Sequence, residues 1–299
     1  MVQLKLTAPP FLTFQHTIKN AGCIIIGDEI LNSKIMDTNS RFFAKKCYEN
    51  GINLRKITVI GDNEKDIIDT VRQFVSKYDF TVTTGGIGST HDDLSYESIA
   101  KAFNLPLEFD KPTYERAKRL NPECIPSKSN AELWDSFRRM LELPYAEDRT
   151  KILYSPTSWT PIVTIDAKLA ILPGVPNFFE DLLAEGLFPQ LKVPGNPFIS
   201  LYVVTKKLEV EFGPYLSSKQ KELLTANENT TIKLGSYPHY EAGVDTISVT
   251  GRQSEAKRIQ QVADDISAKL HGIQISKEQE FTLSNNREFK PMDFLKSLN

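Results

Sequence analysis

The first two-thirds of the chain alternate between short apolar runs and amphipathic stretches. The run from Cys23 to Ile26 is continuous and apolar, which is typical of a strand buried in a parallel sheet. From about Asn63 to Lys77, apolar residues recur at helical spacing and predict a helix with one buried face. Further strands are expected at Leu54 to Ile60 and Phe80 to Thr84, and a helix at Ser40 to Glu49. This order predicts an α/β domain with a doubly wound, mainly parallel sheet.

The alternation of helices and strands continues to the end of the main domain, and a second, smaller domain follows. Helices are expected near residues 112–120, 130–141 and 177–187, and strands near 152, 162–165 and 169–172. Turn formers gather at 193–197, where we place a domain boundary. The β-α-β-β-α order that follows predicts a small α+β domain, either ferredoxin-like or KH-like. We therefore expect an N-terminal extension at 1–19, the main domain at 20–194, the small domain at 195–275 and a charged tail at 276–299.

Composition narrows the class of protein. A formal net charge of −2 disfavours a broad nucleic-acid surface, and no apolar run approaches the length of a membrane span. The N-terminus lacks the apolar core of a secretory signal. The three cysteines are scattered and form no Cys-x-x-Cys pair, which disfavours a zinc site and suits a reducing compartment. We expect a cytoplasmic protein that binds neither membrane nor nucleic acid.

The most informative segment runs from Thr84 to Asp93 and reads Thr-Gly-Gly-Ile-Gly-Ser-Thr-His-Asp-Asp. It links a predicted strand to a predicted helix, so its backbone N–H groups and the helix N-terminus can hold a phosphate. Asp92 and Asp93 have the wrong charge for that phosphate unless a divalent cation lies between them. The alternative is a tight turn whose two aspartates cap the helix.

Two other predicted strands end in acidic loops at the same edge of the sheet. Asp28 and Glu29 follow Gly27 and could ligate a metal or bind a ribose; the alternative is that they are ordinary loop acids. Asp62 is a second candidate for metal or water activation, or else the N-cap of the next helix. The segment 37–39 could bind substrate or cap a helix.

These motifs together resemble those of the molybdopterin-binding-like superfamily. Within it, Gly27-Asp-Glu-Ile-Leu31, Asp37-Thr-Asn39, the glycine loop at 85–93 and Leu172-Pro-Gly-Val-Pro176 are similar to the competence-damage-protein N-terminal group. The chain looks most like the FAD-hydrolysing domain of animal FAD synthases and its free-standing fungal relative, an FAD pyrophosphatase. In the small domain, Leu234-Gly-Ser-Tyr-Pro238 also fits that subgroup.

The resemblance implies a metal-dependent pyrophosphatase that cleaves FAD to FMN and AMP, with ADP-ribose as an alternative substrate. Neither a synthetase-type nucleotide loop nor an amidase domain follows, so FAD synthesis is not expected. Hard oxygen ligands favour magnesium, manganese or cobalt, and a monovalent cation stays open. Superfamily relatives assemble into dimers or trimers, so the resemblance also implies a homo-oligomer.

The resemblance also implies a set of site residues. Asp93 matches the aspartate that follows the glycine loop in the superfamily, and Asp92 and Asp62 join it as candidates for catalysis. Asp92 and Asp93 are the candidate metal ligands. The expected substrate-binding residues are Gly27, Asp28, Glu29, Asp37, Thr38, Asn39, Thr84, Gly85, Gly86, Gly88, Ser89, Thr90 and Gly174.

Three other functions stay open. The same fold and loop serve molybdopterin adenylylation, which the small second domain and the segment 27–31 disfavour. A non-catalytic nucleotide-binding protein would keep the fold without turnover, although all the candidate carboxylates are present. A KH-like nucleic-acid binder is disfavoured because the small domain lacks the loop with which such modules clamp the backbone.

Overall fold

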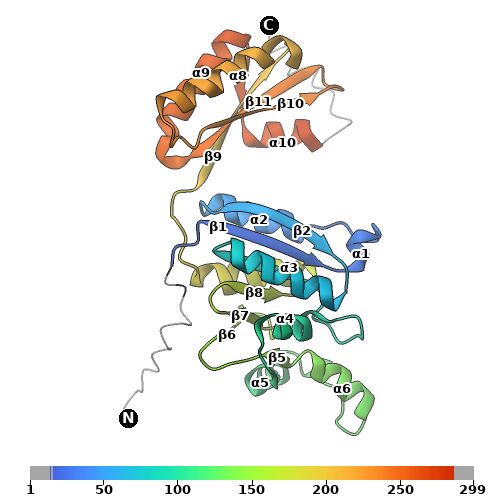
Figure 1. The fold of residues 1–299 in the computed structure, drawn as a ribbon. Coiled ribbons are helices and arrows are strands. Elements are labelled where there is room, and N and C mark those ends of the chain that lie inside the picture. The colour runs from blue at the N-terminus through green and yellow to red at the C-terminus, as the bar shows by residue number, and fades with distance from the viewer. Residues whose placement is uncertain (1–13, 15, 286–299) are drawn as a thin grey trace. The chain divides into compact units, whose positions relative to one another are not determined.

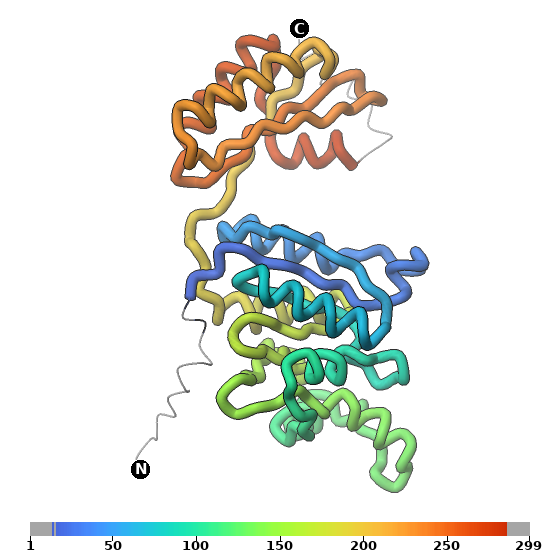
Figure 2. Tube along the Cα trace, in the orientation of Figure 1, coloured from blue at the N-terminus to red at the C-terminus, as the bar shows by residue number. Residues whose placement is uncertain are grey.

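The computed structural model describes residue 14 and residues 16–285. The chain divides into two compact units, Met1–Gly195 and Asn196–Asn299, and Figure 2 traces the path of the chain through both. No helix in the described part is both long and apolar enough to cross a membrane.

The first unit is built on a six-stranded sheet with the order β2-β1-β3-β8-β7-β6 (Figure 1). The strands are β1 (Asn20–Ile26), β2 (Asn53–Ile60), β3 (Phe80–Thr84), β6 (Thr150–Leu153), β7 (Ile162–Ile165) and β8 (Leu169–Leu172). The pairs β1–β2, β1–β3 and β3–β8 are parallel, whereas β7 and β6 add an antiparallel edge. The prediction of a doubly wound, mainly parallel sheet is confirmed.

Helices cover both faces of this sheet, and the alternation along β1 shows how. Cys23 and Ile25 share a core with α2 (Asn39–Glu49), α7 (Pro176–Asp181) and the π-helical turn η3 (Leu182–Leu187) that continues it. Ile24 and Ile26 face the other core, under α3 (Glu64–Lys77) and α4 (Ser95–Phe103). A strand with apolar side chains on both faces must be covered on both faces, so the continuous apolar run specifies its central position.

The segment between α4 and β6 forms a small subdomain with its own core. It contains β4 (Leu107–Phe109), α5 (Lys111–Leu120), the 3₁₀ turn η2 (Pro122–Cys124), α6 (Ala131–Arg139) and β5 (Glu142–Pro144). Ala117, Phe137 and Leu141 form its buried centre, against which Trp134 and Trp159 pack. The strands β4 and β5 pair with each other and are only three residues long. They were not predicted because three residues are too few to show a period of two.

The second unit has a four-stranded antiparallel sheet with the order β10-β11-β9-β12. Its elements are β9 (Phe198–Thr205), α8 (Glu209–Ala226), β10 (Lys233–His239), β11 (Val244–Arg252), α9 (Ala256–Leu270), β12 (Ile273–Ile275) and α10 (Lys277–Asn285). The β-α-β-β-α-β order and the central position of the first strand define a ferredoxin-like fold. Of the two predicted alternatives, the KH-like one is therefore wrong.

The two ends of the chain differ in part from expectation. The expected charged tail at 276–299 begins with a helix, α10, and Leu283 of α10 is buried beside Val204. At the N-terminus, Phe14 packs edge-on against Phe80 and Ile18 is fully buried. The rest of the expected extension, at 1–13 and 15, and the tail at 286–299 lie outside the described residues.

Candidate active site

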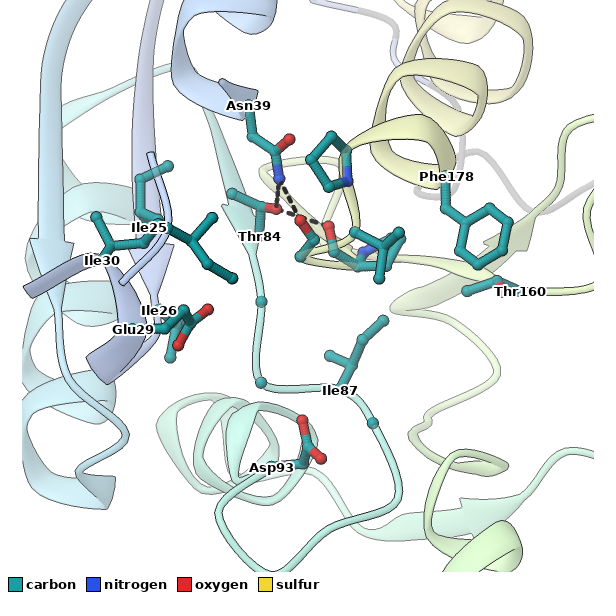
Figure 3. Close-up of a pocket in the computed structure, with 18 of the residues that line it drawn as sticks. Ile25, Ile26, Glu29, Ile30, Asn39, Thr84, Ile87, Asp93, Thr160 and Phe178 are labelled. Atoms are coloured by element: carbon teal, nitrogen blue, oxygen red, sulfur yellow. Dashed lines mark hydrogen bonds between the residues drawn. The ribbon is translucent and has the colours of Figure 1, made fainter. Parts of the chain in front are cut away.

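A cavity of about 450 Å³ opens where β1, β3 and β8 end. This is the carboxyl edge of the sheet, beside the point where the chain first passes to β2 on one side of β1 and then to β3 on the other. Ligands of open α/β sheets collect at such a switch point. Figure 3 shows that Glu29, Thr84, Ile87, Asp93 and Phe178 surround the cavity.

The glycine loop forms the floor of the cavity, and its conformation requires glycine. Gly85 and Gly86 have φ angles of +104° and +64°. A Cβ atom on Gly85 would lie 2.0 Å from the carbonyl oxygen of Ile26, so the loop passes directly against β1. Ser95, at the start of α4, fixes the loop from below, because its hydroxyl donates to Gly85 O at 2.7 Å and its N–H to Gly86 O at 2.9 Å.

A buried hydrogen-bond network joins three segments around the cavity (Figure 3). Asn39 Nδ2 donates to Thr84 Oγ1 at 2.9 Å and to Gly174 O at 2.8 Å, and Thr84 Oγ1 donates to Pro173 O at 2.7 Å. Asn39 is 6% exposed, and its Oδ1 has no hydrogen-bond partner in the described structure. The N-cap of α2 is Thr38, whose side chain makes no cap bond, and Asp37 accepts hydrogen bonds from the N–H and hydroxyl of Ser40 in the first turn.

The two aspartates after the glycine loop lie in different environments. Asp93 lines the cavity, and its Oδ2 accepts hydrogen bonds from Thr90 N at 2.9 Å and from Thr90 Oγ1 at 2.6 Å. Gly88 leaves room for this carboxylate, since a Cβ there would lie 2.6 Å from Oδ2. Asp92 is exposed and does not line the cavity. Hydrogen bonding to the Thr90 side chain, with the charges of His91 and Arg139, lowers the pKa of Asp92.

Acidic charge accumulates at the β1 side of the loop. Asp62 is half-buried and lies behind Gly86, where a Cβ would be 3.5 Å from Asp62 Oδ1. Burial and the charges of Asp28, Glu29 and Asp92 raise the pKa of Asp62, against a hydrogen bond from Asp28 N at 3.0 Å that lowers it. The N-cap of α3 is Asn63 and not Asp62, so the capping alternative for Asp62 is wrong.

The cavity gathers most, but not all, of the predicted site residues. Those that line it are Glu29, Asp37, Thr38, Asn39, Thr84, Gly85, Gly86, Gly88, Asp93 and Gly174. Those that do not are Gly27, Asp28, Asp62, Ser89, Thr90 and Asp92. Ser89 and Thr90 instead line a second hollow, of about 580 Å³, together with His91 and Arg139.

The apolar wall of the cavity was not predicted from the sequence. This wall is formed by Ile35, Met36, Ile87, Tyr96, Met140, Trp159, Val175 and Phe178. Tyr96 is 5% exposed, its hydroxyl has no hydrogen-bond partner among the described residues, and burial raises its pKa, so it is a neutral phenol. Phe178 lies two residues after the Pro-Gly-Val-Pro turn, but the half-exposed position of its apolar ring, which is unusual for a core residue, is visible only in the structure.

The described residues contain no ready-made group of three or more His, Cys, Asp or Glu side chains that could hold a metal ion. The acidic surroundings of Asp62 do fit a cation, since burial and then the negative charges of Asp28, Glu29 and Asp92 raise its pKa. Magnesium in particular binds through one or two carboxylates together with substrate phosphates, and needs no complete protein cage.

Fold and cavity together define an α/β protein with a glycine loop at the switch point of its sheet. Residues 22–193 match the family described as "Probable molybdopterin binding domain", and the chain belongs to this family. It is also related to the competence-damage proteins and to FAD synthase-like proteins.

Named relatives support both relationships. A "Probable FAD synthase" of Caenorhabditis elegans is 30% identical over 268 residues, which cover 85% of this chain and 50% of that protein. A competence-damage inducible protein of Clostridium botulinum is 28% identical over 85% of this chain and 59% of its own length. The chain spans about half the length of the FAD synthase relatives it matches. Among solved structures, the protein CinA of Thermoplasma acidophilum is similar, at 27% identity and a TM-score of 0.48, over 56% of this chain and 94% of that one.

Proposed function

We propose that the cavity is the active site of a metal-dependent dinucleotide pyrophosphatase that hydrolyses FAD to FMN and AMP. The observation that carries the proposal is a glycine loop, held against β1, that shares one cavity with the carboxylates of Glu29 and Asp93. The names of the nematode relatives support FAD as the flavin nucleotide concerned.

Phosphate binding falls to the backbone of the loop. The turn at Gly85 and Gly86 leaves N–H groups without Cβ atoms to shield them, and α4 begins directly after the loop. Ser95 keeps this backbone in place through its two hydrogen bonds to the loop carbonyls. The loop therefore binds a phosphate without having to rearrange, which favours the transition state over the free substrate.

A cation is needed because carboxylates surround the same phosphates. Glu29, which lines the cavity, and Asp62, behind the loop, are the residues that we propose to hold magnesium, manganese or cobalt, with the charge of Asp28 in support. Such an ion withdraws charge from the pyrophosphate when bound. Of the expected ligand pair, Asp93 lies in the cavity and Asp92 outside it, so we assign Asp92 only a long-range contribution.

Asp93 is then placed to orient the attacking water. Thr90 fixes one carboxylate oxygen, Oδ2, with two hydrogen bonds, which holds the side chain in a single direction. Water forms the new P–O bond, the anhydride P–O bond breaks, and its electron pair stays on the departing phosphate. Asp93 takes the proton from the water and passes it to solvent.

Two other reactions remain candidates. Molybdopterin adenylylation is supported by the family description. ADP-ribose hydrolysis needs the same phosphate chemistry but offers no second aromatic ring. The wall around Trp159 and Phe178 favours FAD, because a tricyclic flavin can cover these side chains and a ribose cannot.

The test is a panel of FAD, ADP-ribose, NAD and an adenylylated pterin, incubated with chelator-treated protein and single metals. We expect FMN and AMP in equal amounts from FAD, dependence on magnesium, manganese or cobalt, and no FAD from FMN and ATP. Full activity after exhaustive chelation would remove the metal from the proposal. Hydrolysis of ADP-ribose far faster than FAD would replace the substrate.

The cytoplasmic location and the homo-oligomeric state also remain proposals. Cell fractionation tests the first, and light scattering of the purified protein tests the second. A monomer at micromolar concentration would contradict the oligomer.

A further inference from the structure

The glycine loop has a second hollow on its far side, which the proposed hydrolysis does not use. This hollow has a volume of about 580 Å³ and is lined by hydroxyls and charged groups from the loop, from α6 and from Glu142 of β5. Ser89, Thr90 and His91 come from the loop, and Ser136 and Arg139 come from α6. It lacks the aromatic and aliphatic wall of the main cavity, so its chemistry suits a polar ligand.

Arg139 carries a positive charge that its surroundings leave available. The neighbouring Arg138 is paired with Glu142 through its Nε at 2.8 Å. Arg139, by contrast, makes a long hydrogen bond of 3.4 Å from Nη2 to the main-chain oxygen of Asp93. No carboxylate of the described residues lies within ion-pair distance of it, although the charge of Arg139 contributes to lowering the pKa of Asp92 and Glu142 lines the same hollow. A half-buried guanidinium bonded only to a carbonyl can still bind an anion with both arms of its fork.

The hollow and the main cavity are adjacent at Gly88. A narrow space of about 20 Å³ is lined by Gly88, Asp93 and Tyr96, which also line the main cavity, and by Arg139, which also lines the hollow. This space holds about one water molecule, so a ligand that reaches both sides has to pass over the loop at Gly88, with its pyrophosphate at the turn.

We propose that this hollow is a second subsite, which binds the adenosine monophosphate end of the dinucleotide with Arg139 on its phosphate. The flavin end then lies against Trp159 and Phe178 in the main cavity. The hydroxyls of Ser89 and Ser136 and the carboxylate of Asp135 face the ribose end, since such groups complement ribose hydroxyls. This inference rests on the proposed function, because it assigns the two halves of the proposed substrate.

The experiment measures binding of the two products, so it requires no turnover. Calorimetric titration of AMP, FMN and ribose 5-phosphate is carried out on the full chain and on three variants, with magnesium present. Arg139→Gln should weaken AMP binding at least about tenfold, the scale of one charge-assisted hydrogen bond, and change FMN binding less than twofold. Phe178→Ala should show the reverse pattern.

The matched control is Arg72→Gln. Arg72 also donates to main-chain carbonyls, those of Lys101 and Ala102, but lines neither the cavity nor the hollow. Its substitution should leave both affinities unchanged. Thermal melting of each variant shows whether it is folded.

A competition arm decides whether there are two subsites. Saturating FMN should leave a site for AMP, whereas displacement of one product by the other would overturn the proposal. Unchanged AMP affinity in folded Arg139→Gln, or absence of AMP binding to the wild-type protein, would also overturn it. If AMP binds through Arg139 but FAD is not hydrolysed, the proposed reaction fails and the nucleotide subsite stands.

Discussion

The two walls of the main cavity differ in chemistry and in how they are built. The polar wall consists of the glycine loop, Glu29 and Asp93. Glu29 lies in the short helix α1 (Asp28–Leu31) that follows β1, and the loop with Asp93 links β3 to α4. In the apolar wall, Met140, Trp159 and Phe178 come from three segments distant from the loop in sequence, although Ile87 belongs to the loop itself. We infer that the polar wall determines the rate of bond cleavage, whereas the apolar wall determines which aromatic ring of the substrate is bound.

The largest difference between the two walls is expected from the substitution Asp93→Asn, on the polar wall. Asparagine keeps an oxygen that can accept the two hydrogen bonds from Thr90, so the loop should stay folded and the melting temperature unchanged. Turnover of FAD should fall by at least about a hundredfold, because a positioned base is lost. Steady-state kinetics and thermal melting check both parts.

Asp92→Asn is the matched control for that substitution. Because Asp92 is exposed and outside the cavity, its loss should cost far less turnover than the loss of Asp93. Equal losses from the two variants would show that both carboxylates act on the substrate and that the loop closes differently when substrate is bound.

On the apolar wall, Phe178→Ala should affect substrate binding and leave the chemical step intact. The ring is 51% exposed, so its removal leaves no buried cavity and should change stability little. We expect KM for FAD to rise about tenfold with kcat within a few-fold, on the scale of one stacking contact. Tyr240→Ala removes a ring that is 86% exposed in the other unit and should change neither constant. A fall in kcat with unchanged KM in the Phe178→Ala variant would contradict the proposal that the apolar wall acts in substrate binding alone.

The two walls also differ in how far they could be predicted from the sequence. The strand β3, the glycine loop and α4 follow one another along the chain, so local patterns were enough to place them. The choice between Asp92 and Asp93 was not local in this sense, because it depends on how the turn at Thr90 directs one carboxylate inward. Tertiary packing, which a single sequence does not display, brings Trp159 and Phe178 to the cavity. In the second unit, β12 was missed because three residues carry no periodic signal.

The smallest expected effect concerns charge on the polar wall, and it changes with pH. Burial and neighbouring acids raise the pKa of Asp62 in the folded protein above its unfolded value, so ionised Asp62 opposes folding. The stability that the protonated form provides is fully present below the unfolded pKa and is lost as pH rises through the folded pKa. Asp62→Asn should therefore raise the melting temperature slightly at pH 7, and the gain should disappear as pH falls towards about 4, the ordinary aspartate range.

Magnesium binding offers a second test of the same charge, since a cation bound beside Asp62 relieves the same repulsion. It should stabilise the wild-type protein more than the variant in melting experiments with and without the metal. Equal stabilisation of the two proteins by magnesium would place the cation away from Asp62, and leave Glu29 and Asp93 as the carboxylates able to hold it in the cavity.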